Sequence, residues 1–434
     1  MKALEIDCSA LKYNQFFKRK NLSLIAWCLY DWGNSAFPTL IISFIFAAYF
    51  TNVIAIDEIS GTAEWGYALS ISAFLVAVIS PILGAIADSA GQRKFWLCVF
   101  TSLCILACSS LWYAEPSEEF IFYVLLMVGL GNLFFELCMV FYNSMLPYLS
   151  RNSEVGKLSG IGWGMGYAGG LCCLVIALLF FVQTDNPLFS LNKKEFEHLR
   201  IIGPLVALWV LIFCLPLFIF TNDEPREKIA FKLALSVGLN NLYQTLKYWK
   251  NKASIFRFLI ARMIYADGLS TLFAFGGVFA AGVWGFTFEE LLILGISMNI
   301  VAGFGAIFAA IFEPKIGSKN TIITSLFFLI LFGLAVLIVE QKSLFWLSIL
   351  GLGLFVGPVQ SASRSLMAQL SPIYARAEMF GLYAVSGKAT AFLGPALLSW
   401  TTVFFSSQRA GMATILVFFC VGLFLLFFVR EPKP

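Results

Sequence analysis

The sequence predicts an all-α integral membrane protein with twelve transmembrane helices in two pseudo-symmetric six-helix bundles. Three observations predict this fold class: a very apolar composition, twelve apolar runs of spanning length, and matching motifs in the two halves. Of the 434 residues, 60% are hydrophobic and 12% are charged, against about 25% charged residues in a soluble domain. A soluble core cannot bury this much apolar surface, so the chain must face lipid.

Each apolar run holds roughly the 20 residues that a helix needs to cross the hydrocarbon core. The runs cover 24–50, 65–87, 95–114, 120–148, 158–182 and 201–221 in the first half, and 255–284, 288–312, 320–340, 343–369, 379–404 and 409–429 in the second. We therefore expect an N-terminal bundle (1–222), a cytoplasmic amphipathic linker (223–254) and a C-terminal bundle (255–434). The linker places five apolar residues on one helical face, as in a helix lying at a membrane surface: Leu235, Leu239, Leu242, Leu246 and Trp249.

The distribution of Lys and Arg predicts the orientation. Of the 29 such residues, 21 lie in segments on the side of the N-terminus and five lie on the other side. Positive residues accumulate in cytoplasmic loops, so we expect both termini to be cytoplasmic. The first 20 residues are polar, so we expect a retained first helix and no cleaved signal peptide. The short loops favour a bacterial inner (plasma) membrane.

The two halves repeat each other. Tyr30-Asp31 after Leu24-Ile25-Ala26 recurs as Tyr265-Ala266-Asp267 after Leu259-Ile260-Ala261, and Ser144-Met145-Leu146 recurs as Ser365-Leu366-Met367. These matches lie at equivalent helix positions. Together they indicate a duplicated six-helix unit.

Several classes of chemistry are excluded by composition. The ten cysteines include no CxxC pair, the only histidine is His198, and no G-x-x-x-x-G-K-[ST] phosphate loop is present. The cysteines fit a packing role better than a metal or disulfide framework. We expect no enzyme activity, no metal, no cofactor, no nucleic-acid partner and no direct use of ATP, and we expect a monomer.

A loop motif between the second and third runs reads Gly84-Ala85-Ile86-Ala87-Asp88-Ser89-Ala90-Gly91-Gln92-Arg93-Lys94. Gly84 permits close helix approach, Gly91 permits a tight turn, and Asp88 can cap a helix or pair with a cation across the bundle interface. The segment is similar to the G-x-x-x-D-x-x-G-x-R-K signature of the major facilitator superfamily. That resemblance implies two rocking bundles, with conformational gating by Gly84, Asp88, Gly91, Arg93 and Lys94.

A narrower resemblance covers the first to the eleventh run. The segment Tyr30-Asp31-Trp32-Gly33-Asn34-Ser35-Ala36 resembles the Y-D-W-A-N-S-A signature of the autophagy-related vacuolar permease branch, with Gly33 in place of Ala. Further segments agree: Tyr142-Asn143-Ser144, Asp267-Gly268, Gln360-Ser361-Ala362-Ser363-Arg364-Ser365-Leu366, and Phe380-Gly381-Leu382-Tyr383 with Ser386-Gly387-Lys388. Members of this branch include amino-acid exporters of vacuoles. The resemblance therefore implies transport, with amino acids as the first substrate class.

Six charged side chains lie inside apolar runs, where each costs roughly 2.5–3.5 kcal/mol. Such residues persist when they face a wet cavity or each other, so we predict a substrate site from them and three amides: Asp31, Asn34, Glu136, Asn143, Arg262, Asp267, Gln360, Arg364 and Lys388. Three acids and three bases suit a zwitterion, whose carboxylate binds Arg or Lys and whose ammonium binds Asp or Glu. A coupling proton would be carried first by Glu136 or Asp31.

Alternatives remain open from the sequence. The same charges can form structural or gating ion pairs, with Arg262 neutralising Asp31 or Asp267. The 16% aromatic content also fits an exporter of amphipathic drugs or metabolites. A receptor that kept the fold but does not transport is a third reading.

Overall fold

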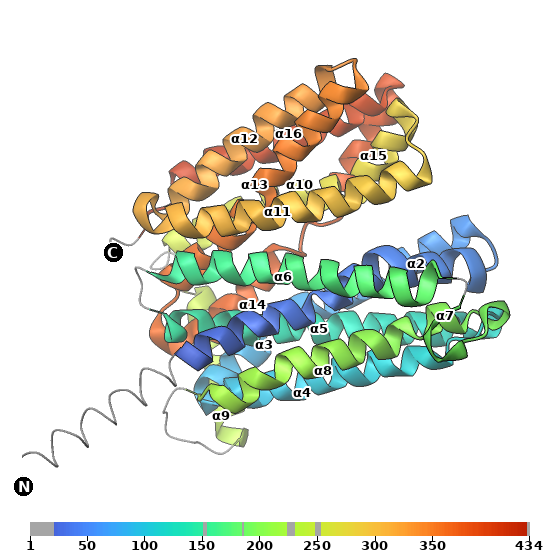
Figure 1. Cartoon of the computed structure of the whole chain (residues 1–434). Coiled ribbons are helices and arrows are strands. Elements are labelled where there is room, and N and C mark those ends of the chain that lie inside the picture. Colours follow the sequence, from blue (N-terminus) through green and yellow to red (C-terminus); the bar gives the residue numbers. More distant parts are fainter. Residues whose placement is uncertain (1–20, 151–153, 185, 224–230, 248–252, 432–434) are drawn as a thin grey trace, which may run out of the picture.

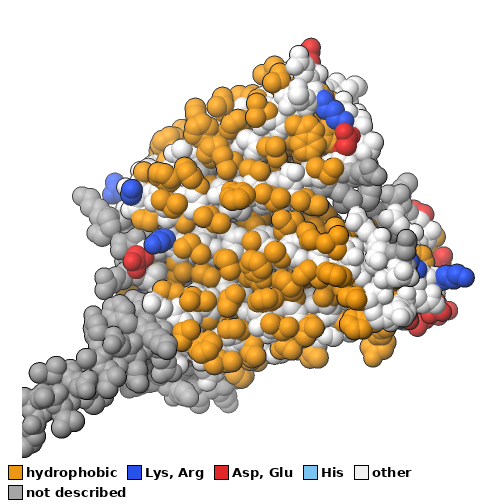
Figure 2. Space-filling view, in the orientation of Figure 1, with side chains coloured by type: hydrophobic (Ala, Val, Ile, Leu, Met, Phe, Trp, Pro, Cys, Tyr) orange, Lys and Arg blue, Asp and Glu red, His pale blue; other side chains and the backbone are white. Residues whose placement is uncertain are grey.

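The computed structural model describes residues 21–150, 154–184, 186–223, 231–247 and 253–431. All regular elements in these ranges are helices. The described chain begins and ends at the same end of the molecule (Figure 1), which we call the termini side; the opposite end is the far side. Figure 2 shows a flank covered by apolar side chains between two ends that carry the visible charges, as a lipid-facing surface requires.

Eleven of the described helices are long and apolar enough to cross a membrane. They are the first span Asn21–Ile54, which contains α2 (Ile45–Tyr49), then α3 (Glu58–Ala90), α4 (Arg93–Ser110), α5 (Ile121–Leu149), α6 (Val155–Ala177), α8 (Ile202–Phe220), α10 (Ala253–Trp284), α11 (Phe288–Ile316), α12 (Ser318–Ile338), α13 (Lys342–Leu370) and α16 (Gln408–Phe427). Each corresponds to one predicted apolar run. The short α7 (Glu197–Arg200) leads into α8.

The eleventh crossing is broken, which corrects the single helix expected over 379–404. It consists of α14 (Arg376–Ser386) and α15 (Leu393–Phe405), joined by turns. Pro395 explains the start of α15, because proline has no N–H to continue a helix but is tolerated in a first turn. Lys388 therefore lies in the break and not on a helix.

The first span also departs from a regular α-helix. Its residues Phe37–Phe44 form a π-helix that begins next to Pro38. Proline removes one backbone hydrogen bond and displaces the preceding carbonyl. The irregularity lies directly after Asp31 and Asn34, two of the predicted site residues.

Matching helix-end contacts relate the two halves. Lys94 donates its backbone N–H to Asp223 (2.9 Å) and its ammonium to a carbonyl just after α8 (2.7 Å). Lys319 donates its backbone N–H to Glu431 (3.3 Å) and its ammonium to a carbonyl just after α16 (2.7 Å). In each half, the third helix is thus tied at its start to the end of the sixth, as a duplicated unit predicts.

The halves meet on the termini side along two helix pairs, α3 with α14 and α6 with α11. Glycine makes the close approach possible: a Cβ on Gly84 would lie 2.4 Å from the carbonyl oxygen of Ala377, and one on Gly160 would lie 2.6 Å from that of Ala306. No larger residue fits at either place without a shift of backbone.

The helix α9 (Phe231–Lys247) lies between the halves in sequence and packs on α3 through Gly238, beside Ala85. Leu235 and Leu239 of the predicted apolar face remain exposed. Trp249 lies outside the described residues, and the proposed domain boundaries stay predictions.

Candidate functional site

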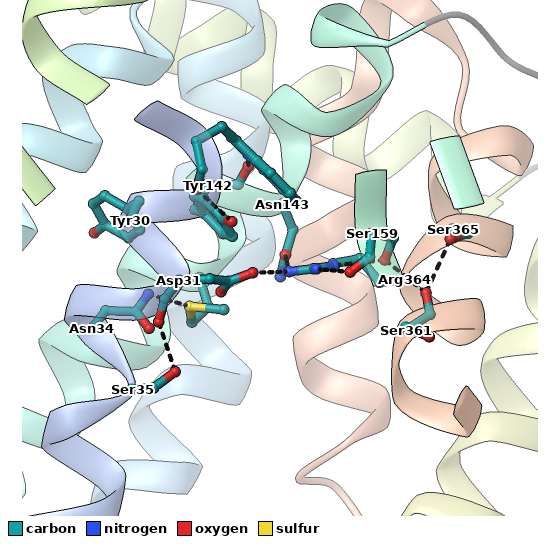
Figure 3. Close-up of polar contacts among 12 residues, drawn as sticks. Tyr30, Asp31, Asn34, Ser35, Tyr142, Asn143, Ser159, Ser361, Arg364 and Ser365 are labelled. Carbon is teal, nitrogen blue, oxygen red and sulfur yellow. Dashed lines mark hydrogen bonds and ion pairs between the residues drawn. The ribbon is translucent and has the colours of Figure 1, made fainter. Parts of the chain in front are cut away.

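One ion pair joins the two halves at a place shielded from water. Arg364 of α13 lies with Nη1 2.9 Å from Oδ2 of Asp31 in the first span, and the two side chains are only 2% and 7% exposed. The same Nη1 donates to Oδ1 of Asn143 on α5 (3.4 Å). Figure 3 shows the guanidinium between the first span and the α6 segment that carries Ser159. Sequence reasoning placed these three residues in one set, and the structure brings them together.

Ser159 of α6 completes the surroundings of Arg364. It receives hydrogen bonds from Nε at its hydroxyl (2.9 Å) and from Nη2 at its carbonyl (2.6 Å). The rings of Trp27, Tyr142 and Trp163 lie 4.9, 5.8 and 5.6 Å from the guanidinium carbon. A buried ion pair is tolerated when its remaining donors are bonded in this way. The arrangement can hold the halves closed; it leaves little access for a solute.

The residues predicted from the sequence as the site include neither Ser159 nor any glycine of α6. A Cβ on Gly162 would lie 2.7 Å from Oδ2 of Asp31 and 2.8 Å from Nη2 of Arg364. Gly162 therefore gives the ion pair its space. The glycine row in the sequence was a signal for this close approach, but it does not tell which partner approaches.

A second ion pair joins the halves where side chains are more accessible. Nζ of Lys388 lies 2.7 Å from Oε1 of Glu136, and the side chains are 30% and 20% exposed. Glu136 comes from the middle of α5, and Lys388 comes from the break between α14 and α15. A discontinuous helix near mid-membrane is a common way to build a binding site in transporters. Because both side chains are accessible, Lys388 and Glu136 can each leave the other and bind an opposite charge on an incoming molecule.

Arg262 and Asp267 lie together on α10, but both contact the eleventh crossing of their own half. Arg262 donates to the carbonyl of Tyr383 (2.6 Å) and the hydroxyl of Ser386 (2.7 Å). Asp267 accepts from the backbone N–H of Gly394 (3.2 Å). The expectation that Arg262 neutralises Asp31 is wrong, since Arg364 occupies that place.

The two remaining amides have separate partners. Asn34 donates to the sulfur of Met139 (3.2 Å). Gln360 of α13 accepts from the hydroxyl of Tyr167 on α6 (2.5 Å), which adds another contact between the halves. Among the described residues, no three His, Cys, Asp or Glu side chains lie together as a metal site requires.

The motif that spans the end of α3, the turn after it and the start of α4 lies at the termini-side contact. Asp88 is paired with Arg93 (2.6 Å), and its other oxygen accepts from the backbone N–H of Glu378 in the first turn of α14 (2.9 Å). A carboxylate is favoured at a helix N-terminus. Gly91 has a φ of 65°, the left-handed conformation expected of its turn. The motif thus contacts the opposite half directly, and its gating role stays a prediction.

The comparison with known proteins decides the family. A family model described as "Vacuole effluxer Atg22 like" matches residues 19–433. The chain belongs to this Atg22-like family. An uncharacterized MFS-type transporter of Bacillus subtilis (strain 168), YxiO, is 25% identical over 96% of each chain. Autophagy-related protein 22 of Kluyveromyces lactis is 25% identical over 84% of this chain and 79% of its own.

Solved structures share the fold of this Atg22-like chain. The proton:xylose symporter XylE has a TM-score of 0.71 at 13% identity over 96% of each chain. FucP in its outward conformation has a TM-score of 0.72 at 11% identity, over 95% of this chain and 99% of its own. At such identities the likeness shows the fold alone, and it confirms the predicted major facilitator fold. As an Atg22-like member of that superfamily, the protein is a membrane transporter and not an enzyme.

Proposed function

We propose that the protein is a secondary active transporter of a small zwitterion, with amino acids as the first class, and that it works by alternating access. The observation that carries the proposal is the Glu136–Lys388 pair. It links the two halves, it is partly exposed, and one partner lies in a break of a spanning helix.

A zwitterion can replace each half of this pair. Its carboxylate would bind the ammonium of Lys388, and its ammonium would bind the carboxylate of Glu136, so neither protein charge is left alone in a poorly solvated place. A solute with a single charge would satisfy one partner and strand the other. This asymmetry favours zwitterions over anions and over neutral amphipathic molecules.

The buried Asp31–Arg364 pair has a different role in this proposal. Its partners fill every side of the guanidinium, so it serves as a lock between the halves on the termini side and does not bind solute. The excess of Lys and Arg assigns the termini side to the cytoplasm. The described conformation is then closed toward the cytoplasm.

Two further elements belong to the proposal. We infer a coupling proton with Glu136 as its first carrier, supported by the proton symport named for XylE. We also propose that the protein is a monomer. We place it in a bacterial inner (plasma) membrane, supported by the Bacillus relative, which it matches over 96% of each chain.

The test is uptake into liposomes that contain the purified protein. Radiolabelled amino acids are screened with wild type, Lys388→Ala and Lys342→Ala. Lys342 forms a comparable pair with Glu290 (2.5 Å), but that pair lies within one half and on the far side. We expect uptake of one amino-acid class that Lys388→Ala abolishes and Lys342→Ala leaves unchanged.

Absence of uptake for every amino acid, in protein that unfolds cooperatively, would contradict the zwitterion proposal. Uptake of amphipathic cations or drugs in the same vesicles would then favour the exporter alternative. Loss of activity in both lysine variants would show that the effect is not specific to the Glu136–Lys388 pair.

A further inference from the structure

The break in the eleventh crossing is contacted at both ends by charged side chains of one neighbouring helix. The break runs between Ser386, the last residue of α14, and Leu393, the first residue of α15, and it contains Lys388. Arg262 and Asp267 of α10 lie five residues apart, or about 7.5 Å along a helix axis. The helix α10 and the eleventh crossing both run from the termini side to the far side. Arg262, which comes first on α10, therefore meets the end of α14, and Asp267 meets the start of α15.

Arg262 closes the end of α14. Its Nη1 donates to the carbonyl of Tyr383 (2.6 Å) and to the hydroxyl of Ser386 (2.7 Å). Its guanidinium carbon lies 3.4 Å from the centre of the Tyr383 ring. The last carbonyls of a helix lack partners and carry partial negative charge, so a cation with donors stabilises this end.

Asp267 closes the start of α15. Its Oδ2 accepts from the backbone N–H of Gly394 in the first turn (3.2 Å), where a carboxylate is favoured. A third contact secures the chain between these ends: the hydroxyl of Thr390 donates to the carbonyl of Met263 on α10 (3.2 Å). The eleventh crossing is therefore bonded to α10 at three places: the end of α14, the break itself and the start of α15.

We propose that Arg262 and Asp267 are positioning residues that hold the eleventh crossing broken and thereby present Lys388 to Glu136. The proposal rests on the function proposed above for Lys388. It replaces the sequence-based expectation that these two residues bind the solute themselves.

The space around Asp267 supports this assignment. Asp267 is 2% exposed, and a Cβ on Gly394 would lie 1.9 Å from the hydroxyl of Thr271 and 2.9 Å from Oδ1 of Asp267. No solute fits between these groups. All partners of Arg262 and Asp267 named above belong to the C-terminal half, so rocking of the halves leaves the contacts intact while Lys388 meets or leaves Glu136.

Hydrogen exchange of the peptide 384–396 in the purified full chain tests the proposal without any solute. We expect Asp267→Ala and Arg262→Gln to accelerate its exchange roughly fivefold, the effect of losing one hydrogen bond. Asp267→Asn keeps an oxygen that accepts from Gly394, so we expect exchange close to wild type. Lys388→Ala removes the presented group but no fastening contact, so its exchange should also stay close to wild type.

Two results would overturn the proposal: unchanged exchange in both Asp267→Ala and Arg262→Gln, or acceleration in Asp267→Asn equal to that in Asp267→Ala. The second result would show that the charge of Asp267, and not the oxygen that accepts from Gly394, holds the start of α15. If Asp267→Ala does not fold, the partly buried Arg262 tests the other end independently. Solute uptake measured on the same variants separates the two proposals, because Lys388→Ala should lose uptake while exchange is unchanged.

Discussion

Replacing Arg364 by methionine should open the termini side of the molecule. Methionine keeps much of the apolar bulk of the side chain but removes the donors to Asp31 and Ser159. Asp31 then stays buried without its cation. The expected consequence is a shift toward conformations in which the two halves have parted and water reaches Asp31.

The magnitude follows from burial. Both side chains of the pair are less than one-tenth exposed, and removing one partner of such a pair costs about 3–5 kcal/mol. The contact joins the two halves, so its loss weakens the closed conformation more than an opened one. A difference of about 3 kcal/mol changes the ratio of the two conformations by roughly 150-fold.

The assay is a distance measurement between spin labels on the termini side of each half. Suitable exposed positions are Phe95 at the start of α4 and Ile316 at the end of α11. We expect the distribution in Arg364→Met to move to longer distances. Arg409→Met is the matched control, because Arg409 also donates to backbone carbonyls, but only within its own half.

The double variant Asp31→Leu with Arg364→Met separates loss of the contact between the halves from burial of an unpaired Asp31. Replacing both partners by apolar groups removes the stranded charge, so most of the closed population should return. An unchanged distribution in Arg364→Met, or an equal shift in Arg409→Met, would refute the assignment of this pair as a lock.

Three further predictions concern small changes at named contacts. Gly162→Ala should lower the free energy of unfolding by about 1–3 kcal/mol through overpacking against the ion pair. Gly276 has open space around it, so Gly276→Ala should leave that free energy unchanged. Thermal unfolding of both variants in detergent measures the difference. Gly91→Ala, at a φ of 65°, should destabilise by about 1 kcal/mol in the same assay. Asp88→Ala removes the acceptor for the N–H of Glu378 and should lengthen the termini-side distance between spin labels, while Asp88→Asn should lengthen it less.

Most of the fold could be predicted from the sequence because its physical cause is local. Apolar runs of spanning length and the Lys and Arg distribution need no knowledge of packing, and eleven runs correspond to spanning helices in the described part of the chain. The break after Ser386 was missed because it interrupts a run that stays apolar. Pro395 was the available signal, but a proline inside an apolar run can equally produce a kink, as beside Pro38.

The charged residues inside the membrane were predicted as a set but not as pairs. Burial cost selects six charged residues, since each is expensive in lipid, but it does not separate the four that pair between the halves (Asp31, Glu136, Arg364 and Lys388) from the other two. Which acid meets which base depends on the rotation and tilt of four helices from two halves, and no sequence pattern fixes these. Ser159 is the clearest omission, because a serine is inexpensive in a helix and carries no signal until Arg364 is seen beside it.

The two ion pairs between the halves differ in a way that suits a transport cycle. Opening the termini side requires Arg364 to leave Asp31 and Ser159 together, which is costly unless another bond between the halves compensates. Under the proposed function, a zwitterion bound between Glu136 and Lys388 would supply such a bond in place of an ion pair that is already accessible. In this proposal the solute does not push the halves apart. It lowers the free energy of an intermediate that is closed on both sides, from which either side can open. The free energy that a ligand contributes in this way equals its difference in affinity between the conformations, so solutes that bind only one of the two charges should occupy the site without promoting exchange across the membrane.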